Sequence, residues 1–219
     1  MENIKWLGHA SFEITDTKGN KIYFIDPYQL PEGLEDKADL IFITHAHQDH
    51  LSLGDIDHIL KETTIVVATP DSLETLKVSQ GQKFAVDPNQ KYDLDGIKFE
   101  TVPAYNVDPD KQSFHPKSNN WVGYILNVNG MKIYHAGDCD FMPEMNSFKE
   151  KNLDIAMLPI GGHYTMDVDE AIQAANAIAA KTTIPMHYRG LLKEKSAEAE
   201  EKFKSGVTNS TVLILDEAS

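Results

Sequence analysis

The segment Thr44-His45-Ala46-His47-Gln48-Asp49-His50 places four side chains of metal-ligand type within six residues. The apolar run directly before it is typical of a short buried strand. Because alternate residues of an extended chain point to the same side, His45 and His47 can hold one metal ion together. Asp49 and His50 follow where the chain turns, so they can reach a second ion. Neutral imidazole and carboxylate are the ligands of catalytic zinc, and they also suit iron and manganese.

A solvated loop that happens to be rich in histidine is the alternative, but three histidines and an aspartate at a strand end are hard to produce by drift. Two ions need further ligands, which the ends of later strands must supply. Asp138 ends the predicted strand Met131–His135, where a carboxylate can bridge two ions and His135 is expected to brace the turn. His187 follows the predicted strand Thr183–Pro185. Alone, Asp138 would be a turn aspartate and His187 a half-buried histidine; beside the cluster, we interpret both as ligands.

The composition limits what the chain can do. Its 219 residues fit one large domain or two small ones, and 41% hydrophobic with 25% charged residues is typical of a globular protein. The net charge of −14 argues against nucleic acid as a partner, although bound cations can still attract an anionic substrate. No apolar run could span a bilayer and no signal peptide is evident, so no membrane partner is expected. Cys139, the single cysteine, has no intrachain partner, which favours a reducing compartment such as the cytoplasm.

Segments rich in β-branched and aromatic residues alternate with turn residues and predict a series of strands. Asn129-Gly130, between two of them, is a strong hairpin signal. The strands are expected at Ile4–Leu7, Ser11–Ile14, Lys21–Ile25, Leu40–Thr44, Thr64–Ala68, Ile97–Val102, Val122–Val128, Met131–His135, Ile155–Leu158, Thr183–Pro185 and Thr211–Leu215.

Helices are fewer. The clearest, Asp167–Ala180, has an apolar stripe at helical spacing and Asp167 as its expected N-cap. Others are expected at Gly54–Leu60, Pro70–Val78 and Ala197–Lys204. The long irregular stretch from Pro103 to Asn120 is expected to be functional or disordered. These elements predict a layered α/β or α+β fold with large sheets, forming one domain over residues 1–219.

A weak internal repeat is also present. The stretch from Gly19 to Asp26 resembles the stretch from Gly130 to Asp138, with one extra residue before the aspartate. The match hints at a duplicated half-domain, and chance is an adequate rival explanation for so short a match.

The motif His-x-His-x-Asp-His, from His45 to His50, resembles the hallmark of the metallo-β-lactamase superfamily. Later motifs of that family follow in order, with a bridging aspartate at Asp138 and a terminal histidine at His187. Asp26 matches the family's first, structural aspartate. The resemblance covers nearly the whole chain. It implies a four-layer αββα sandwich with the site along one edge of the sheets, and a pseudo-twofold that would account for the internal repeat.

Within the superfamily, the chain looks most like the small metal-dependent hydrolases related to ascorbate-6-phosphate lactonase and to the phospholipase D that cleaves N-acyl phosphatidylethanolamine. The local signs are the segments from Leu7 to Phe12, from Tyr134 to Asp138 and from Pro159 to Met166.

Two positions depart from the family pattern. Asn106 stands where the lone histidine of the third motif is expected, and His115 or His9 is expected to replace it. Cys139 stands where relatives usually have threonine or serine. Its thiol is either a neighbour of the metal site or a small buried residue, and we favour the second.

The resemblance implies two metal-binding positions. Zinc is the expected metal, with manganese and iron as alternatives. A water between the ions would lose a proton near neutral pH, and the hydroxide would attack a carbonyl carbon or phosphorus. The first ion is assigned to His45, His47, His115 and Asp138, and the second to Asp49, His50, Asp138 and His187.

Further groups are expected to act on the substrate. Asp49 would also hold the hydroxide in line. His9 and His163, which the resemblance places near the metals, would donate to the substrate or to the leaving group. Arg189 and Lys117 are candidates for binding an anionic group, with an ordinary surface cation as an equal alternative.

The sequence therefore predicts a metal-dependent hydrolase that uses a metal-bridged hydroxide to cleave a small ester, lactone or phosphodiester bond. Its partner is expected to be a small, anionic molecule. A metal-binding or nucleic-acid-binding module without hydrolytic activity is the alternative, but structural zinc sites are usually closed and rich in cysteine. A di-iron oxidoreductase is disfavoured because such relatives typically carry glutamate where His47 stands. The substrate, the native metal and the oligomeric state stay open.

Overall fold

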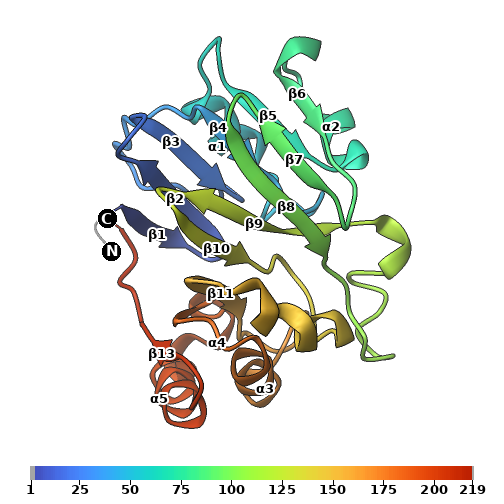
Figure 1. Ribbon diagram of the computed structural model, residues 1–219, viewed down its shortest axis with the longest axis vertical. Helices are drawn as coiled ribbons and strands as arrows, with labels where there is room; N and C mark the ends of the chain where they lie inside the picture. Colours follow the sequence, from blue (N-terminus) through green and yellow to red (C-terminus); the bar gives the residue numbers. More distant parts are fainter. Residues whose placement is uncertain (1–2, 219) are drawn as a thin grey trace. The chain divides into compact units, whose positions relative to one another are not determined.

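The computed structural model describes residues 3–218, which form two compact units (Figure 1). The first unit holds residues 3–87 and 215–218 of the described chain, and the second holds residues 88–214. Each unit is built on its own β-sheet. Among the described residues, no helix combines the length and the apolar character needed to cross a membrane. The single domain predicted over residues 1–219 stays a prediction.

The first unit contains a six-stranded sheet whose strands follow one another in chain order. The strands are β1 (Ile4–Gly8), β2 (Ser11–Asp16), β3 (Lys21–Ile25), β4 (Leu40–Phe42), β5 (Ile65–Ala68) and β6 (Lys83–Ala85). Strands β1 to β3 pair antiparallel through tight turns, whereas β3 to β6 pair parallel and need crossovers. The crossovers contain α1 (Leu53–Ile59), α2 (Pro70–Thr75) and η1 (Gln80–Gln82). The C-terminal residues return to this unit, where Ala218 N donates to Trp6 O at 2.8 Å.

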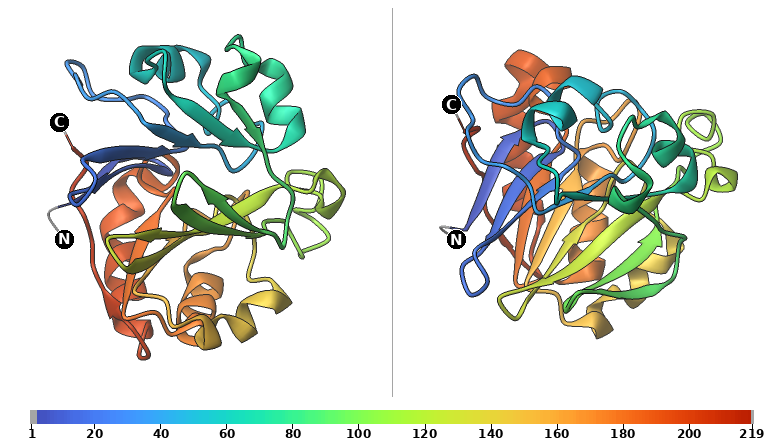
Figure 2. Two further views of the ribbon diagram at one scale, coloured as in Figure 1. Left: turned by 45° about the horizontal axis from the view of Figure 1, so that its top comes forward. Right: turned by 90° about the horizontal axis from the view of Figure 1, so that it is seen from above.

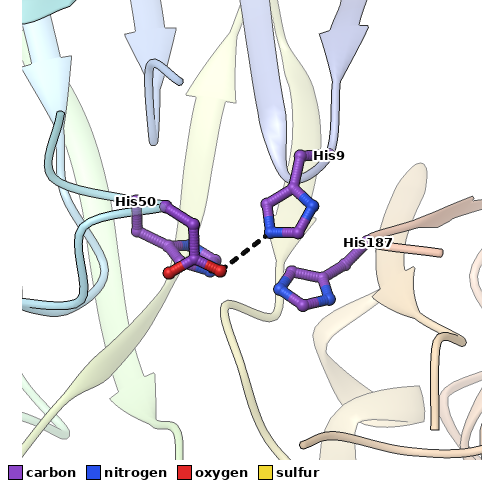
Figure 3. A group of neighbouring side chains, drawn as sticks. His9, His50 and His187 are labelled. Atoms are coloured by element: carbon purple, nitrogen blue, oxygen red, sulfur yellow. Dashed lines mark hydrogen bonds and ion pairs between the residues drawn. The ribbon is translucent and has the colours of Figure 1, made fainter. Parts of the chain in front are cut away.

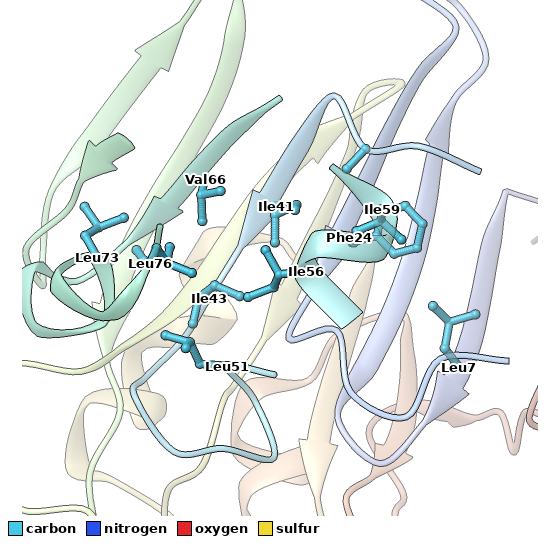
Figure 4. Packing of buried hydrophobic residues seen from close by; sticks show 12 residues of the cluster. Leu7, Phe24, Ile41, Ile43, Leu51, Ile56, Ile59, Val66, Leu73 and Leu76 are labelled. Atoms are coloured by element: carbon cyan, nitrogen blue, oxygen red, sulfur yellow. The ribbon is translucent and has the colours of Figure 1, made fainter. Parts of the chain in front are cut away.

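The core of the first unit joins its sheet to its helices (Figure 4). Ile56 and Ile59 of α1 belong to one buried cluster with Ile41 of β4 and Val66 of β5, and all four are at most 1% exposed. Burying one such side chain contributes about 1.5–3 kcal/mol. This cluster fixes β4, after whose carboxyl end the loop from His45 to His50 begins.

The second unit contains a seven-stranded sheet, again with its strands in chain order, and its helices can be followed in orange and red in Figure 2. Strands β7 to β10 pair antiparallel and β10 to β13 pair parallel. Helix α3 (Val168–Ile178) packs against β11 (Ile155–Pro159), η3 (Pro143–Lys151) and α5 (Ser196–Gly206). The remaining elements are β7 (Lys91–Leu94), β8 (Ile97–Pro103), η2 (Lys117–Asn119), β9 (Val122–Val128), β10 (Met131–His135), β12 (Thr182–Met186), α4 (Arg189–Leu192), η4 (Lys193–Lys195) and β13 (Thr211–Val212).

Local signals in the second unit are confirmed. Asn129 and Gly130 form the two-residue turn between β9 and β10, with φ of 54° and 85°. Both values are positive, as a type I′ hairpin turn requires. Asp167 is the N-cap of α3, and its Oδ1 accepts from Glu170 N at 2.9 Å.

The two sheets share one pairing pattern, and the internal repeat falls on matching strands. Strand β3 pairs antiparallel with β2 and parallel with β4. In the second unit, β10 likewise pairs antiparallel with β9 and parallel with β11. This topology supports the duplicated half-domain over chance.

The predicted strands and helices all form, with shifts at their ends. Strand β4 ends at Phe42, two residues before the predicted end at Thr44, because the Thr44 backbone N bonds to an aspartate side chain. Strand β13 is also shorter than predicted. The sequence missed β6, β7, α4 and the 3₁₀ helices η1 to η4. Strands β6 and β7 are only three and four residues long, so their sequence signal is weak.

Candidate metal centre

A buried aspartate organises the loop that follows β4. Asp26 comes directly after β3 and is fully buried. Its Oδ1 accepts a hydrogen bond from Thr44 N at 2.8 Å, and its Oδ2 accepts from Thr44 Oγ1 at 2.7 Å. His50 Nδ1 lies 2.8 Å from the same Oδ2. Asp26 therefore ties the start of the loop to its end, in agreement with the structural role expected for it.

The hydrogen bonds of this loop assign the protons of two histidines. A carboxylate only accepts, so His50 donates its Nδ1 proton to Asp26 and keeps its lone pair on Nε2. Thr44 has one hydroxyl proton, which it gives to Asp26, so its Oγ1 accepts from His45 Nδ1 at 2.9 Å. His45 therefore also keeps its lone pair on Nε2. Such contacts at the second ring nitrogen are typical of metal-binding histidines.

His45 and His47 present ring nitrogens to one another. His45 Nε2 lies 3.1 Å from His47 Nδ1. Two nitrogens bound tetrahedrally to one zinc ion, with bonds of about 2.0 Å, lie about 3.3 Å apart. The pair therefore fits the expectation that both side chains bind one ion.

His9, Asp49 and His50 form a second group of donors in the first unit (Figure 3). His9 Nε2 lies 3.0 Å from Asp49 Oδ2, the contact drawn as a dashed line, and His50 Nε2 lies 3.9 Å from that oxygen. One ligand atom from each residue lies within 4.8 Å of the other two. The Asp49 side chain is 39% exposed, whereas that of His50 is buried. His9 therefore lies next to Asp49 and His50, the two donors of this unit that are assigned to the second ion.

Asp138 is the centre of the donor group in the second unit. Its Oδ2 lies 3.3 Å from His115 Nε2 and 3.2 Å from His187 Nε2. All three side chains are at most 3% exposed. Gly137 N donates to His135 Nδ1 at 3.2 Å, so the predicted brace of this turn is confirmed. The second unit brings together three of the predicted metal ligands.

Two residues of these donor groups, and the aspartate that organises the loop after β4, hold backbone conformations that are rare for residues with a side chain. His9, Asp26 and His187 have φ of 50°, 46° and 56°. Such conformations cost on the order of 1–3 kcal/mol and persist where the surrounding structure imposes them, often at functional sites. Each of the three directly follows a β-strand, so the strained residues lie at the boundaries between strands and loops.

The position of His187 depends on a glycine, which leads to a first prediction. A Cβ on Gly161 would lie 2.2 Å from the His187 carbonyl oxygen. Gly161→Ala is therefore expected to displace His187, to lower the free energy of unfolding by about 1–3 kcal/mol and to weaken zinc binding by about tenfold or more. Urea unfolding and zinc titration measure the two effects. Gly190→Ala is the control, because its Cβ would meet nothing within 4 Å. Zinc binding by Gly161→Ala at wild-type strength would contradict the prediction.

Asn106 stands where the third-motif histidine is expected, and it contacts His115. Asn106 Oδ1 lies 2.8 Å from His115 Nδ1, while Asn106 Nδ2 donates to Asp140 Oδ1 at 2.9 Å. Sequence reasoning missed Asp140, which is fully buried. A second carboxylate two residues after Asp138 was the signal that could have found it.

His163 packs among aromatic rings. Its ring centroid lies 5.6 Å from that of Phe114 and 4.4 Å from that of Tyr164. In the part of the chain that the structure describes, the groups of donors that could hold an ion do not include His163. Its predicted role as a proton donor to the substrate stays a prediction.

The two cations predicted to bind an anionic group have partners within the second unit. Arg189 Nη2 lies 3.1 Å from Glu200 Oε1. Lys117 Nζ lies 3.2 Å from Glu144 Oε1 and donates to the Tyr105 hydroxyl at 3.0 Å. Both charges are therefore engaged locally, which favours the alternative that they are surface cations.

Cys139 lies between the two aspartates of this turn. Burial, followed by the charge of Asp138, raises the pKa of its thiol well above the usual value. A protonated thiol is a poor metal ligand and nucleophile. The side chain is fully buried, which agrees with the favoured interpretation of a small buried residue.

Comparisons with known proteins identify a matching family model, related sequences and similar solved structures. A family model described as the beta-lactamase superfamily domain matches residues 3–187. A metal-dependent hydrolase of Thermococcus onnurineus is 38% identical over 86% of this chain and 85% of its own length. A solved structure from Parabacteroides distasonis has a TM-score of 0.83 at 33% identity, covering 99% of this chain and 93% of that one. A structure of the metallo-β-lactamase superfamily from Thermotoga maritima has a TM-score of 0.63 at 22% identity, covering 97% of each chain.

Proposed function

Because this chain belongs to the beta-lactamase superfamily and is similar to metal-dependent hydrolases, we propose that it hydrolyses a small ester, lactone or phosphodiester with two bound divalent metal ions. The superfamily and the fold class predicted from the sequence are confirmed. The chain is a metal-dependent hydrolase and not a binding module without activity. The closer likeness to the lactonase and the phospholipase stays a prediction.

One observation supports the proposal above all: buried acceptors face one ring nitrogen in each of three candidate ligands. His45 faces a threonine hydroxyl, His50 a carboxylate and His115 a side-chain amide, in every case through Nδ1. Each contact leaves Nε2 for a ligand, as in known metal-binding histidines. Histidines that serve only packing need no such arrangement at three separate places.

All members of the proposed ligand set are imidazoles or carboxylates, a set that fits zinc and also manganese or iron. We take zinc as the native metal in this proposal. The first ion would be held by His45, His47, His115 and Asp138, and the second by Asp49, His50, Asp138 and His187.

Bound divalent ions lower the pKa of water to roughly 7 and stabilise negative charge that develops on oxygen. Side chains of the protein would accept and donate the protons of the reaction. Asp49 is partly exposed and can accept a proton from the attacking water, while His9 Nε2, 3.0 Å from Asp49 Oδ2, orients that carboxylate. His9 and His163 are the proposed donors to the substrate or to its leaving group. Because Arg189 and Lys117 are already paired with carboxylates, attraction of an anionic substrate would rest on the metal ions.

The experiment that tests the proposal is metal content per chain, measured on protein purified without chelator. We expect two ions per chain in the wild type and about one in His115→Ala, because that variant removes one imidazole from the first set. Hydrolysis is measured in parallel on a nitrophenyl ester, a simple lactone and a nitrophenyl phosphodiester. His58→Ala is the matched control, since His58 is exposed and its imidazole contacts the Leu34 carbonyl.

Each outcome decides something about the two-metal mechanism. Two ions in the wild type and in His58→Ala, with one in His115→Ala, support it. One ion in the wild type, unchanged in His115→Ala, would replace it with a mechanism that uses a single metal. Hydrolysis that survives complete removal of metal by a chelator would contradict it altogether.

A further inference from the structure

We propose that Asn106 is a positioning residue, which fixes the tautomer of the His115 imidazole, and that Asp140 in turn fixes Asn106. Asn106 thereby takes over an indirect role at the position where a histidine ligand is expected. The inference rests on the proposed function, in which His115 binds a metal ion. All the contacts that support it lie within the second unit.

The orientation of the Asn106 side-chain amide follows from its neighbours. One end of the amide faces Asp140 Oδ1 at 2.9 Å and the Tyr164 carbonyl oxygen at 3.0 Å. Both of these atoms can only accept hydrogen bonds, so this end must be the NH₂ group. The other end, which faces His115 Nδ1 at 2.8 Å, is therefore the carbonyl oxygen. Asn106 is 2% exposed, so water does not offer an alternative arrangement.

The carbonyl of Asn106 determines where the His115 proton lies. An oxygen acceptor at 2.8 Å requires a proton on Nδ1, so in the neutral, metal-binding form of the imidazole the lone pair lies on Nε2. That nitrogen is the one that faces Asp138 Oδ2, at 3.3 Å. A second contact joins the two residues, because Asn106 N donates to the His115 backbone oxygen at 2.9 Å. The loop between them is thus closed by a backbone bond and a side-chain bond.

Asp140 holds Asn106 from the other side. Its Oδ2 accepts from Val107 N at 2.7 Å and from Asp108 N at 2.9 Å, and its Oδ1 accepts from Asn106 Nδ2. The carboxylate is fully buried, so these bonds are not exchanged with water. Asp140 comes two residues after Asp138. One short segment therefore contains both a proposed ligand and the anchor of the residue that orients another ligand.

The test combines two measurements on the full-length protein. Long-range ¹H–¹⁵N NMR reads whether His115 Nδ1 carries a proton, and zinc titration gives the dissociation constant. In the wild type we expect a protonated Nδ1, both as purified and after chelation. In Asn106→Leu, which keeps the branching at Cγ but removes the acceptor, we expect the proton to move to Nε2 and zinc binding to weaken by about 10- to 100-fold. Asn119→Leu, at an exposed position in η2, is the matched control.

A paired exchange separates positioning from general structural support. Asp140→Asn alone should disturb the amide of Asn106 and shift the His115 tautomer. Asn106→Asp together with Asp140→Asn again supplies an acceptor at position 106 and a donor at position 140. We expect this double variant to recover the protonated Nδ1 and to bind zinc more tightly than Asp140→Asn alone, but less tightly than the wild type, because an oxygen at position 106 then faces the Tyr164 carbonyl oxygen.

Several results would overturn the inference. A wild-type His115 with its proton only on Nε2 would do so without any variant, which keeps the test decisive even if Asn106→Leu does not fold. Wild-type zinc affinity in Asn106→Leu would do so as well. Failure of the proposed function is distinguishable, because a protein that binds no zinc at all would still report the His115 tautomer by NMR.

Discussion

Replacing the Asp138 carboxylate by an amide is expected to lower kcat/KM by at least about 10³-fold. In the proposed ligand set Asp138 contributes to both ions, so Asp138→Asn removes a negative charge from each of them. Its Oδ2 lies within 3.3 Å of Nε2 of both His115 and His187, and an amide NH₂ group there would face those nitrogens as a donor. The measurement is kcat/KM on whichever ester, lactone or phosphodiester the wild type hydrolyses, together with metal content per chain.

A matched control distinguishes this effect from the loss of a carboxylate charge elsewhere in the second unit. Asp154→Asn makes the same chemical change directly before β11, where the carboxylate pairs with the largely exposed Lys181 at 2.6 Å. Exposed pairs of this kind contribute about 0–1 kcal/mol to stability, so activity and metal content should stay at the wild-type level. An Asp138→Asn variant with two ions per chain and near-normal turnover would contradict the assignment of Asp138 as a shared ligand.

The second large effect is expected on stability. Asp26→Ala removes the acceptor of three buried donors, which are the N–H and O–H of Thr44 and the Nδ1–H of His50. Leaving buried donors without partners costs about 1–3 kcal/mol each, and these costs overlap within one network. We expect the free energy of unfolding of the metal-free protein to fall by about 3–5 kcal/mol. Urea unfolding monitored by circular dichroism measures it.

The same variant should also affect the metal. Without Asp26, the His50 imidazole is no longer held with its proton on Nδ1, so zinc binding should weaken by about 10- to 100-fold. Asp36→Ala is the control, because Asp36 is 42% exposed and pairs only with Lys5 among the ion pairs of the described residues. A loss of less than about 1 kcal/mol in Asp26→Ala, together with unchanged zinc affinity, would show that Asp26 does not organise the loop.

Asp26 and Asp138 occupy matching positions in the two units but make different contacts. Each follows the strand that changes from antiparallel to parallel pairing, β3 in one sheet and β10 in the other. Asp26 accepts from a backbone amide, a hydroxyl and one imidazole, whereas Asp138 faces the Nε2 atoms of two imidazoles. Matching turns in the two units therefore contain a structural carboxylate in one and a candidate ligand in the other. The difference lies in the side chains that the neighbouring loops bring to each aspartate.

Much of the fold could be predicted from the sequence, and so could the cluster of donors after β4. The cluster from His45 to His50 is local, so its spacing alone indicates metal chemistry. Apolar strands, the Asn129-Gly130 turn and the Asp167 cap are also local signals, and all of them are confirmed. The weak points were β6 and β7, because short strands acquire their pairing from the sheet and not from their own residues.

By itself, the sequence determined the family, the fold class and the residue types able to bind metal, because these depend on spacing along the chain. Only the tertiary structure decided what each side chain contacts. Asn106 and Asp140 are 34 residues apart, and no pattern along the chain indicates that one amide would orient His115. Likewise, His9 and Asp49 are 40 residues apart but in contact. Such pairs form where separate strand ends meet, so the packing of whole sheets fixes them and the local sequence does not.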